Sequence, residues 1–132
     1  NRQYRFKLII FTTMQIQVVK SKIHRVKVTG ADLDYIGSIT IDEDLMDQVN
    51  IRTHEQVHVF NINNGHRFIT YAIPGKRGGQ GISINGAATH LAKINDRIII
   101  VAYGIMELDK ENITPKVLVL NENNKIVKKK GI

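Results

Sequence analysis

Hydrophobic and polar residues alternate in short runs along most of this chain. Val26 and Val28 alternate with Arg25, Lys27 and Thr29, which is typical of a β-strand with one buried face. The same period of two returns in later runs, so the pattern predicts many short strands. Further strands are expected at residues 56–62, 67–73, 82–84, 97–103, 116–120 and 125–127.

Turn signals and two short helical segments separate these strands. Asn63-Asn64-Gly65 predicts a tight turn between two of the strands, because Asn and Gly tolerate positive φ. The run Ile98–Val101 is apolar on both faces, which predicts a strand near the centre of the sheet. Short helices are expected over 43–49, with Asp42 as the N-cap, and over roughly 87–92.

These elements predict one mainly β domain closed into a barrel, which removes unpaired edge strands. A chain of 132 residues is one domain by length. Residues 14–132 are expected to form the barrel, and residues 1–13 an added or upstream-extended arm before Met14. No apolar stretch approaches the roughly 20 residues of a membrane span, so no membrane association is expected.

Composition excludes some chemistry and leaves one alternative open. The chain has no cysteine, which rules out disulfides and thiolate sites and favours a reducing, cytoplasmic location. The net charge of +7 raises the question of nucleic acid, but much of the excess lies at the two ends. Aromatic residues make up only 6% and are not interleaved with the basic positions, so no nucleic-acid partner is expected. A small basic β-barrel that binds nucleic acid or a protein without catalysis remains the alternative.

Isolated motifs carry little chemistry in this sequence. The glycine-rich loop 75–81 lacks the spacing and the strand–helix context of a phosphate-binding loop, so it indicates a mobile or tightly turned connection. The five histidines show no spacing that supports a metal site, and no metal is expected. Taken alone, Gly37-Ser38 indicates only a turn that enters a strand.

Three sequence blocks are informative together: Lys22–Ser38, Asn64–Ile73 and Ile84–Ala88. In their residues, order and spacing they resemble bacterial aspartate 1-decarboxylases, enzymes of pantothenate biosynthesis. The resemblance runs from about Met14 to Glu107 and fades in the C-terminal tail. It implies a double-psi β-barrel that assembles as a homotetramer.

The resemblance also implies that the chain makes its own cofactor. The Ser38 hydroxyl would attack the Gly37 carbonyl, and the resulting ester would eliminate to leave a pyruvoyl group at the start of residues 38–132, with residues 1–37 as the second piece. A ketone that forms a Schiff base with the amine of L-aspartate is an electron sink for releasing CO2 and forming β-alanine. Because position 38 is a serine, the chain as written is the precursor. Whether an accessory maturation factor takes part is left open.

Two adjacent strand residues receive roles in the same site by this resemblance. Thr70 would hydrogen-bond the Gly37 carbonyl during cleavage, and Tyr71 would supply the proton that follows CO2 loss. Neighbours on a strand point to opposite faces. Both can therefore serve one site only if the strand bends or the site lies between subunits.

Two cations are expected to hold the substrate. Arg67 and Lys22 would bind the carboxylates of aspartate, with the forked guanidinium of Arg67 on the carboxylate that stays. Clamping the departing carboxylate would stabilise the ground state and slow the reaction. The remaining residues expected around the substrate are Asn85, Gly86, Ala87, Ala88 and Tyr35.

Overall fold

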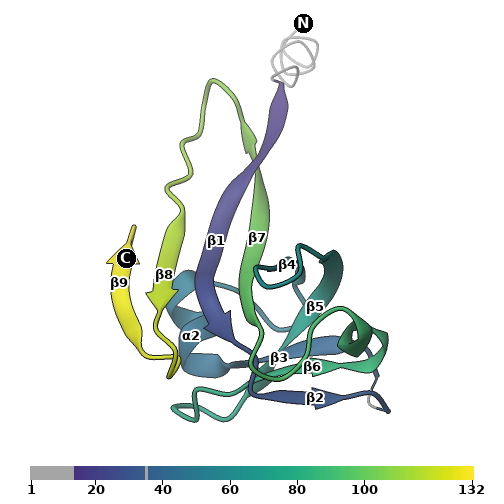
Figure 1. Ribbon diagram of the computed structural model, residues 1–132. Coiled ribbons are helices and arrows are strands. Elements are labelled where there is room, and N and C mark those ends of the chain that lie inside the picture. The colour runs from purple at the N-terminus through teal and green to yellow at the C-terminus, as the bar shows by residue number, and fades with distance from the viewer. Residues whose placement is uncertain (1–13, 35) are drawn as a thin grey trace, which may run out of the picture.

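The computed structural model describes residues 14–34 and 36–132 and is mainly β (Figure 1). The predicted arm 1–13 and Tyr35 lie outside the described residues. The helical elements are α2 (Glu43–Val49) and a 3-10 helix, η1 (Gly86–His90). The strands are β1 (Gln15–Lys27), β2 (Gly30–Asp32), β3 (Ser38–Asp42), β4 (Gln56–Asn61), β5 (Arg67–Gly75), β6 (Ile82–Asn85), β7 (Arg97–Glu107), β8 (Lys116–Leu120) and β9 (Ile126–Lys130).

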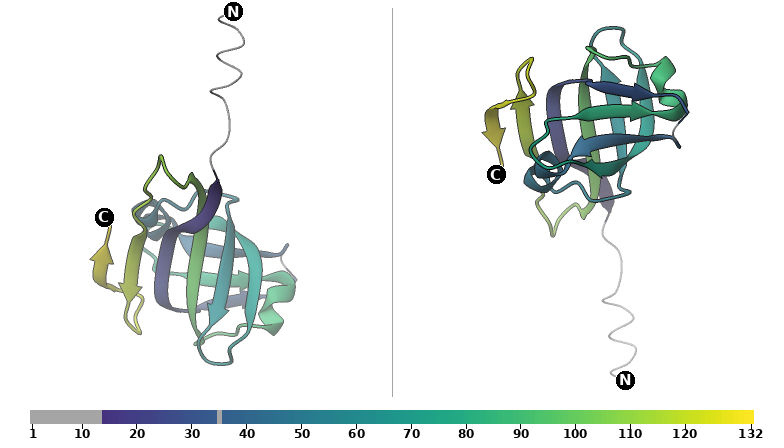
Figure 2. Two further views of the ribbon diagram at one scale, coloured as in Figure 1. Left: turned by 90° about the horizontal axis from the view of Figure 1, so that it is seen from above. Right: turned by 90° about the horizontal axis from the view of Figure 1, so that it is seen from below.

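The described strands join in the order β2-β6-β3-β5-β4-β7-β1-β8-β9. The sheet curls round on itself, as the two views along the barrel show (Figure 2). The pairs β1–β8, β2–β6 and β3–β5 are parallel, whereas the other pairs are antiparallel. A plain up-and-down meander has no parallel neighbours. The parallel pairs therefore join strands from distant parts of the sequence. The prediction of a mainly β barrel is confirmed.

The core lies inside the curled sheet and is made of alternate strand residues. On β7, Ile98 and Ile100 are fully buried and Val101 is almost so. β7 pairs with β1 on one side and β4 on the other, so the central place predicted for this apolar run is confirmed. Leu45, Met46 and Val49 on α2 complete the core.

The two helical predictions have different outcomes. α2 begins after Asp42, whose side chain accepts a hydrogen bond from the Asp44 N–H at 2.9 Å, as expected for an N-cap. The second segment is a 3-10 helix over Gly86–His90, where an ordinary short helix was expected over 87–92. The Asn85 side chain does not cap this helix and is directed elsewhere.

β1 is longer than the sequence pattern predicted, and with β7 it extends as a two-stranded ribbon (Figure 1). Its pairing with β7 shifts register between Val19 and Ser21 and again between Ile23 and Val26. Arg25, in the second irregularity, has a φ of 66°. Among the residues that the structure describes, no helix is long and apolar enough to cross a membrane.

The glycine-rich loop is tightly held. The Asp42 carboxylate accepts hydrogen bonds from the N–H groups of Gly78 at 3.2 Å and Gln80 at 2.8 Å. Asn124 donates to the Gln80 carbonyl at 3.1 Å. Hydrogen bonds to Asp47 and Asp44 raise the pKa of Arg77 and tie the loop to α2. Of the two readings of this loop, the tightly turned one is correct.

We expect Asp42→Ala to lower the free energy of unfolding by about 3 kcal/mol, since it removes a helix cap and two charged hydrogen bonds from a buried carboxylate. Urea denaturation followed by circular dichroism measures this. Asp42→Asn is the matched control, because it keeps one acceptor oxygen and should lose about half as much. Equal stability of Asp42→Ala and the parent chain would show that the loop is held by other contacts.

Candidate active site around Ser38

Ser38 is the first residue of β3 and is 1% exposed. Its Oγ accepts a hydrogen bond from Asn85 Nδ2 at 3.0 Å and lies 3.4 Å from the Ile36 carbonyl oxygen, to which it donates. Ser38 and Asn85 are directly opposite in the antiparallel pair β3–β6. The structure therefore brings together two of the predicted site residues that are 47 positions apart.

Two hydroxyls that the sequence analysis did not select complete this cluster. Asn85 Nδ2 also donates to Thr40 Oγ1 at 2.9 Å, and Ser83 Oγ donates to Asn85 Oδ1 at 3.3 Å. Ser38 and Thr40 are two apart on β3, and Ser83 and Asn85 are two apart on β6, so all four point to the same face of the sheet. Polar residues two positions apart on each strand were therefore the sign of this cluster in the sequence.

Tyr71 lies beside Ser38, whereas Thr70 faces the other way. β3 and β5 run parallel, with Ile39 paired to Ala72. Ser38 and Tyr71 each come one residue before this pair on their own strands. Both therefore point to the face of the sheet opposite Ile39 and Ala72. No register shift occurs in the pairing of β5 with β3 or with β4, so the strand does not bend to bring Thr70 round.

Gly37, which directly precedes Ser38, has open space beside it. A Cβ on the exposed Gly37 would meet nothing within 4 Å, and the φ of Gly37 is outside the left-handed region. The bond before Ser38 is thus accessible, and the backbone at Gly37 is not in the left-handed region. Gly86, with a φ of 70°, and then Ala87 and Ala88 follow Asn85 directly at the start of η1.

The two predicted cations lie on another part of the sheet. Lys22 on β1 is in register with Val101 on β7, which is in register with His58 on β4. β1 is four strands from β3 in the order of the sheet, so strand pairing does not set Lys22 beside Ser38. Arg67 is four residues before Tyr71 on β5, or about 13 Å. One chain therefore does not bring Lys22 or Arg67 to Ser38.

Arg67 has its own small pocket. Its guanidinium carbon lies 4.7 Å from the centroid of the Phe60 ring, and His58 and Tyr103 pack edge to face at 4.9 Å. A hollow of about 310 Å³ is lined by these four side chains with Phe68 and Ile69. A stacked guanidinium beside an apolar wall can take the carboxylate of a small molecule.

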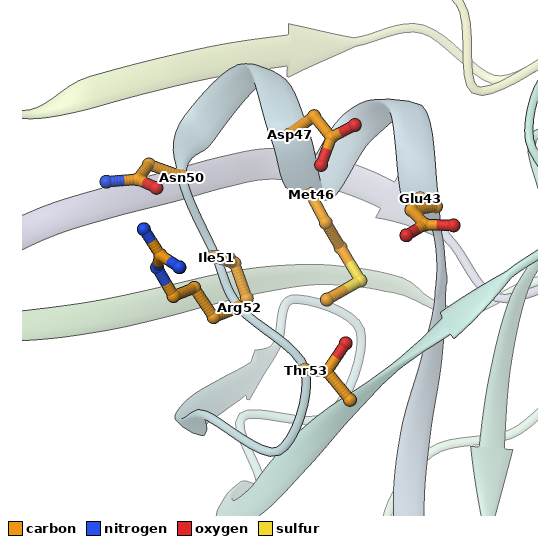
Figure 3. A pocket seen from close by; sticks show the side chains of 7 residues that line it. All are labelled: Glu43, Met46, Asp47, Asn50, Ile51, Arg52 and Thr53. Atoms are coloured by element: carbon orange, nitrogen blue, oxygen red, sulfur yellow. The ribbon is translucent and has the colours of Figure 1, made fainter.

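A larger hollow of about 500 Å³ lies away from both groups, beside α2 and the segment that follows it (Figure 3). Its walls include the carboxylates of Glu43 and Asp47, which both pair with Arg77 at 3.3 and 2.7 Å. None of the predicted site residues lines it. Its acidic groups already have a partner, so this hollow is not the candidate site.

His24, two residues after Lys22 on β1, has a shifted pKa and should make the stability of the chain depend on pH. Burial, followed by the charges of Lys22, Arg25 and Arg97, lowers the pKa of His24 from its ordinary value of 6.5. Its Nδ1 is buried without a partner among the described residues.

Because the unfolded chain binds the His24 proton more readily, we expect stability to be highest above pH 6.5 and to fall as the pH drops below it. The melting temperature of the parent chain and of His24→Gln, measured between about pH 7.5 and 5, tests this, since the variant should lose less on acidification. Parallel curves for the two proteins would contradict the assignment.

Known proteins similar to this chain decide its family. The family model described as aspartate decarboxylase matches residues 14–127. The chain belongs to the aspartate decarboxylase family. A curated aspartate 1-decarboxylase from Christiangramia forsetii is 56% identical over 116 residues, which are 87% of this chain and 100% of that protein. The aspartate 1-decarboxylase from Thermoanaerobacter pseudethanolicus is 54% identical over 86% of this chain and 98% of that protein.

Other matches agree with this family. The aspartate 1-decarboxylase from Caldicellulosiruptor saccharolyticus is 51% identical over 87% of this chain and 91% of that protein. Among solved structures, the computationally designed protein msDPBB_sym2 aligns with a TM-score of 0.41 and 14% identity, over 66% of this chain and 99% of the designed one. A likeness of that size adds nothing to the strand pairing described above. Family membership therefore rests on the sequence matches.

Proposed function

We propose that this chain is the precursor of an enzyme that decarboxylates L-aspartate to β-alanine and CO2 for pantothenate biosynthesis, and that it matures by cleaving itself between Gly37 and Ser38. Membership of the aspartate decarboxylase family supports the reaction. The observation that carries the maturation step is the buried Ser38 hydroxyl, which accepts a hydrogen bond from Asn85 beside an accessible peptide bond.

Cleavage would use atoms of the chain alone, together with water. Ser38 Oγ attacks the Gly37 carbonyl carbon, the C–N bond breaks, and the hydroxyl proton passes to the nitrogen, which leaves an ester. The α-hydrogen of residue 38 then leaves as a proton and the Gly37 carboxylate departs from its β-carbon, which gives dehydroalanine. Water adds to the imine form of this residue, and the nitrogen leaves as ammonia, so that a ketone remains. A hydrogen bond donated to Oγ by Asn85 favours negative charge on the attacking oxygen.

The side chains around residue 38 fit a pyruvoyl group. Asn85 offers an N–H donor to an oxygen at this position, and there is open space beside the preceding Gly37. The ketone of that group supplies the electron sink for decarboxylation. The Tyr71 phenol, on the strand next to Ser38, would deliver the proton that replaces the departing carboxylate. Thr70 remains the proposed partner of the Gly37 carbonyl.

We further propose that the complete site is shared between subunits of a homotetramer. The Ser38 cluster and the Arg67 pocket are separated along the sheet of one chain, and Lys22 is farther still. Arg67 lies on the outer face of the sheet, where Ile69 is 60% exposed beside it, and Ser38 is buried next to the exposed Gly37. Packing the outer face of one copy against another would set Arg67 and Lys22 of one subunit opposite Ser38 of its neighbour.

In such a site, Arg67 would hold the carboxylate that stays on the product. Its guanidinium is stacked on Phe60 and forms no ion pair with any residue in the described part of the chain. A fixed planar fork suits a carboxylate that keeps its charge throughout the reaction. Lys22 would supply the second positive charge, and Tyr35 is proposed to close the site.

Denaturing mass spectrometry of the purified chain during warming, with an assay for β-alanine, tests the proposal. We expect an intact mass to give way to masses for residues 1–37 and 38–132, and β-alanine to form from aspartate as it does so. A chain that stays intact and makes no β-alanine even with added cell extract would contradict it. Addition of a cell extract from a β-alanine-producing bacterium separates spontaneous cleavage from cleavage that needs an accessory factor.

The competing function, a small basic barrel that binds nucleic acid or protein without catalysis, is not favoured by the family. Its basic features also have other contacts, because Arg77 is paired with three acids. A cytoplasmic location remains a prediction.

A further inference from the structure

The Asn85 amide uses its hydrogen-bonding groups in full, although only one of these bonds reaches Ser38. We propose that Thr40 and Ser83 are positioning residues for self-cleavage, because their hydroxyls hold the Asn85 amide in place against Ser38. This rests on the proposed function and adds two residues to it.

The Ile36 carbonyl favours one orientation of the amide, because it takes the Ser38 proton and leaves Oγ to accept from Nδ2. Both N–H groups of Asn85 Nδ2 are occupied, by Ser38 Oγ at 3.0 Å and Thr40 Oγ1 at 2.9 Å, while Oδ1 accepts from Ser83 Oγ at 3.3 Å. Asn85 is only 4% exposed, so water offers little replacement for a lost partner. The Ser38 proton is directed to the Ile36 carbonyl, which leaves Oγ free to accept.

The opposite orientation would change the chemistry of Ser38. With Oδ1 towards Ser38, the hydroxyl would donate its proton to the amide oxygen and receive no hydrogen bond. An amide oxygen is too weak a base to remove that proton, and negative charge developing on Oγ would meet a lone pair in place of an N–H. Cleavage would therefore be slower with the amide reversed.

Packing fixes where the two hydroxyls lie. A Cβ on Gly75 would come within 3.0 Å of Thr40 Cγ2, so the Thr40 methyl group rests against the Gly75 backbone and its hydroxyl is left towards Asn85. A Cβ on Gly30 would come within 3.1 Å of Ser83 Oγ, so Ser83 lies equally close to β2. Close contact with a neighbouring glycine therefore limits where each of the two side chains can lie.

Paired substitutions at Thr40 separate its hydroxyl from its methyl group. Thr40→Val keeps a methyl against Gly75 and loses the hydroxyl, and we expect cleavage to slow about tenfold, as for one lost hydrogen bond in the transition state. Thr40→Ser keeps the hydroxyl and loses the methyl, and should cleave within about twofold of the parent chain. Ser83→Ala should slow cleavage by several-fold. The rates come from denaturing mass spectrometry of freshly purified precursor.

A double-mutant cycle shows whether Thr40 acts through Asn85. If it does, Thr40→Val should slow the parent chain but cause no further slowing in an Asn85→Ala background. The assignment would be overturned if Thr40→Val cleaved at the parental rate, or if Thr40→Ser slowed cleavage as much as Thr40→Val does. It would also be overturned if Thr40→Val slowed cleavage equally with and without Asn85. A parent chain that does not cleave at all overturns the proposed function, and this inference with it.

Discussion

Ser38→Ala is expected to remain one uncut chain and to form no β-alanine at any time of incubation. The substitution removes the only atom that is proposed to attack the Gly37 carbonyl, and with it the source of the ketone. Asn85 keeps its bond to Thr40, and β3 keeps its backbone pairing with β5 and β6, so the fold should lose only about 1 kcal/mol of stability. Intact mass, the β-alanine assay and a thermal melt measure the three effects.

Ser21→Ala is the matched control for this result. Ser21 is also fully buried on a strand, and its hydroxyl donates to the Val49 carbonyl, away from the cluster. It should lose stability but still be cut at Gly37-Ser38. Cleavage or turnover by Ser38→Ala would contradict the mechanism. A failure of both variants to be cut would point to a general loss of fold.

Arg67→Ala is expected to be cut at the parental rate but to lose aspartate binding. Removing one partner of a charged hydrogen-bonded pair costs about 2–5 kcal/mol, so kcat/KM should fall by roughly a hundredfold or more, mainly through KM. The Arg67 pocket is separated from Ser38 within one chain, which is why maturation should not change. Intact mass and steady-state kinetics measure the two steps separately.

Two variants sharpen the test at Arg67. Arg67→Lys keeps the charge without the planar fork or the stacking on Phe60, and should recover only part of the lost affinity. Arg52→Ala removes an exposed cation beside α2 and should leave KM unchanged. An unchanged KM for Arg67→Ala would remove Arg67 from the substrate site, whereas loss of cleavage in this variant would place it in the maturation step.

Local sequence predicted the elements better than their contacts. The Asp42 cap, α2 and the hairpin turn at Asn63–Gly65 follow from short-range chemistry, and the structure has each of them. The extra length of β1 and the 3-10 geometry of η1 were missed, because pairing with β7 and packing against the barrel decide them.

The candidate site was predicted residue by residue from family resemblance, but its geometry was not. No local signal places β6 beside β3, so the contact between Asn85 and Ser38 could not be seen in the sequence. Thr40 and Ser83 were missed because a hydroxyl on a strand usually reflects strand propensity. The distance of Arg67 and Lys22 from Ser38 follows from strand order, which depends on pairings between remote segments.

The position of β1 has a consequence for the mature protein. This strand lies between β7 and β8 and buries Ile23 and Val26, yet it would belong to the smaller product of cleavage. The two products would thus remain one body held by non-covalent pairing, and they should co-migrate in a native gel. Refolding, which is unimolecular for the precursor, would become a bimolecular encounter and depend on protein concentration. A cut enzyme that has once unfolded in dilute solution would then recover far less readily than its own precursor.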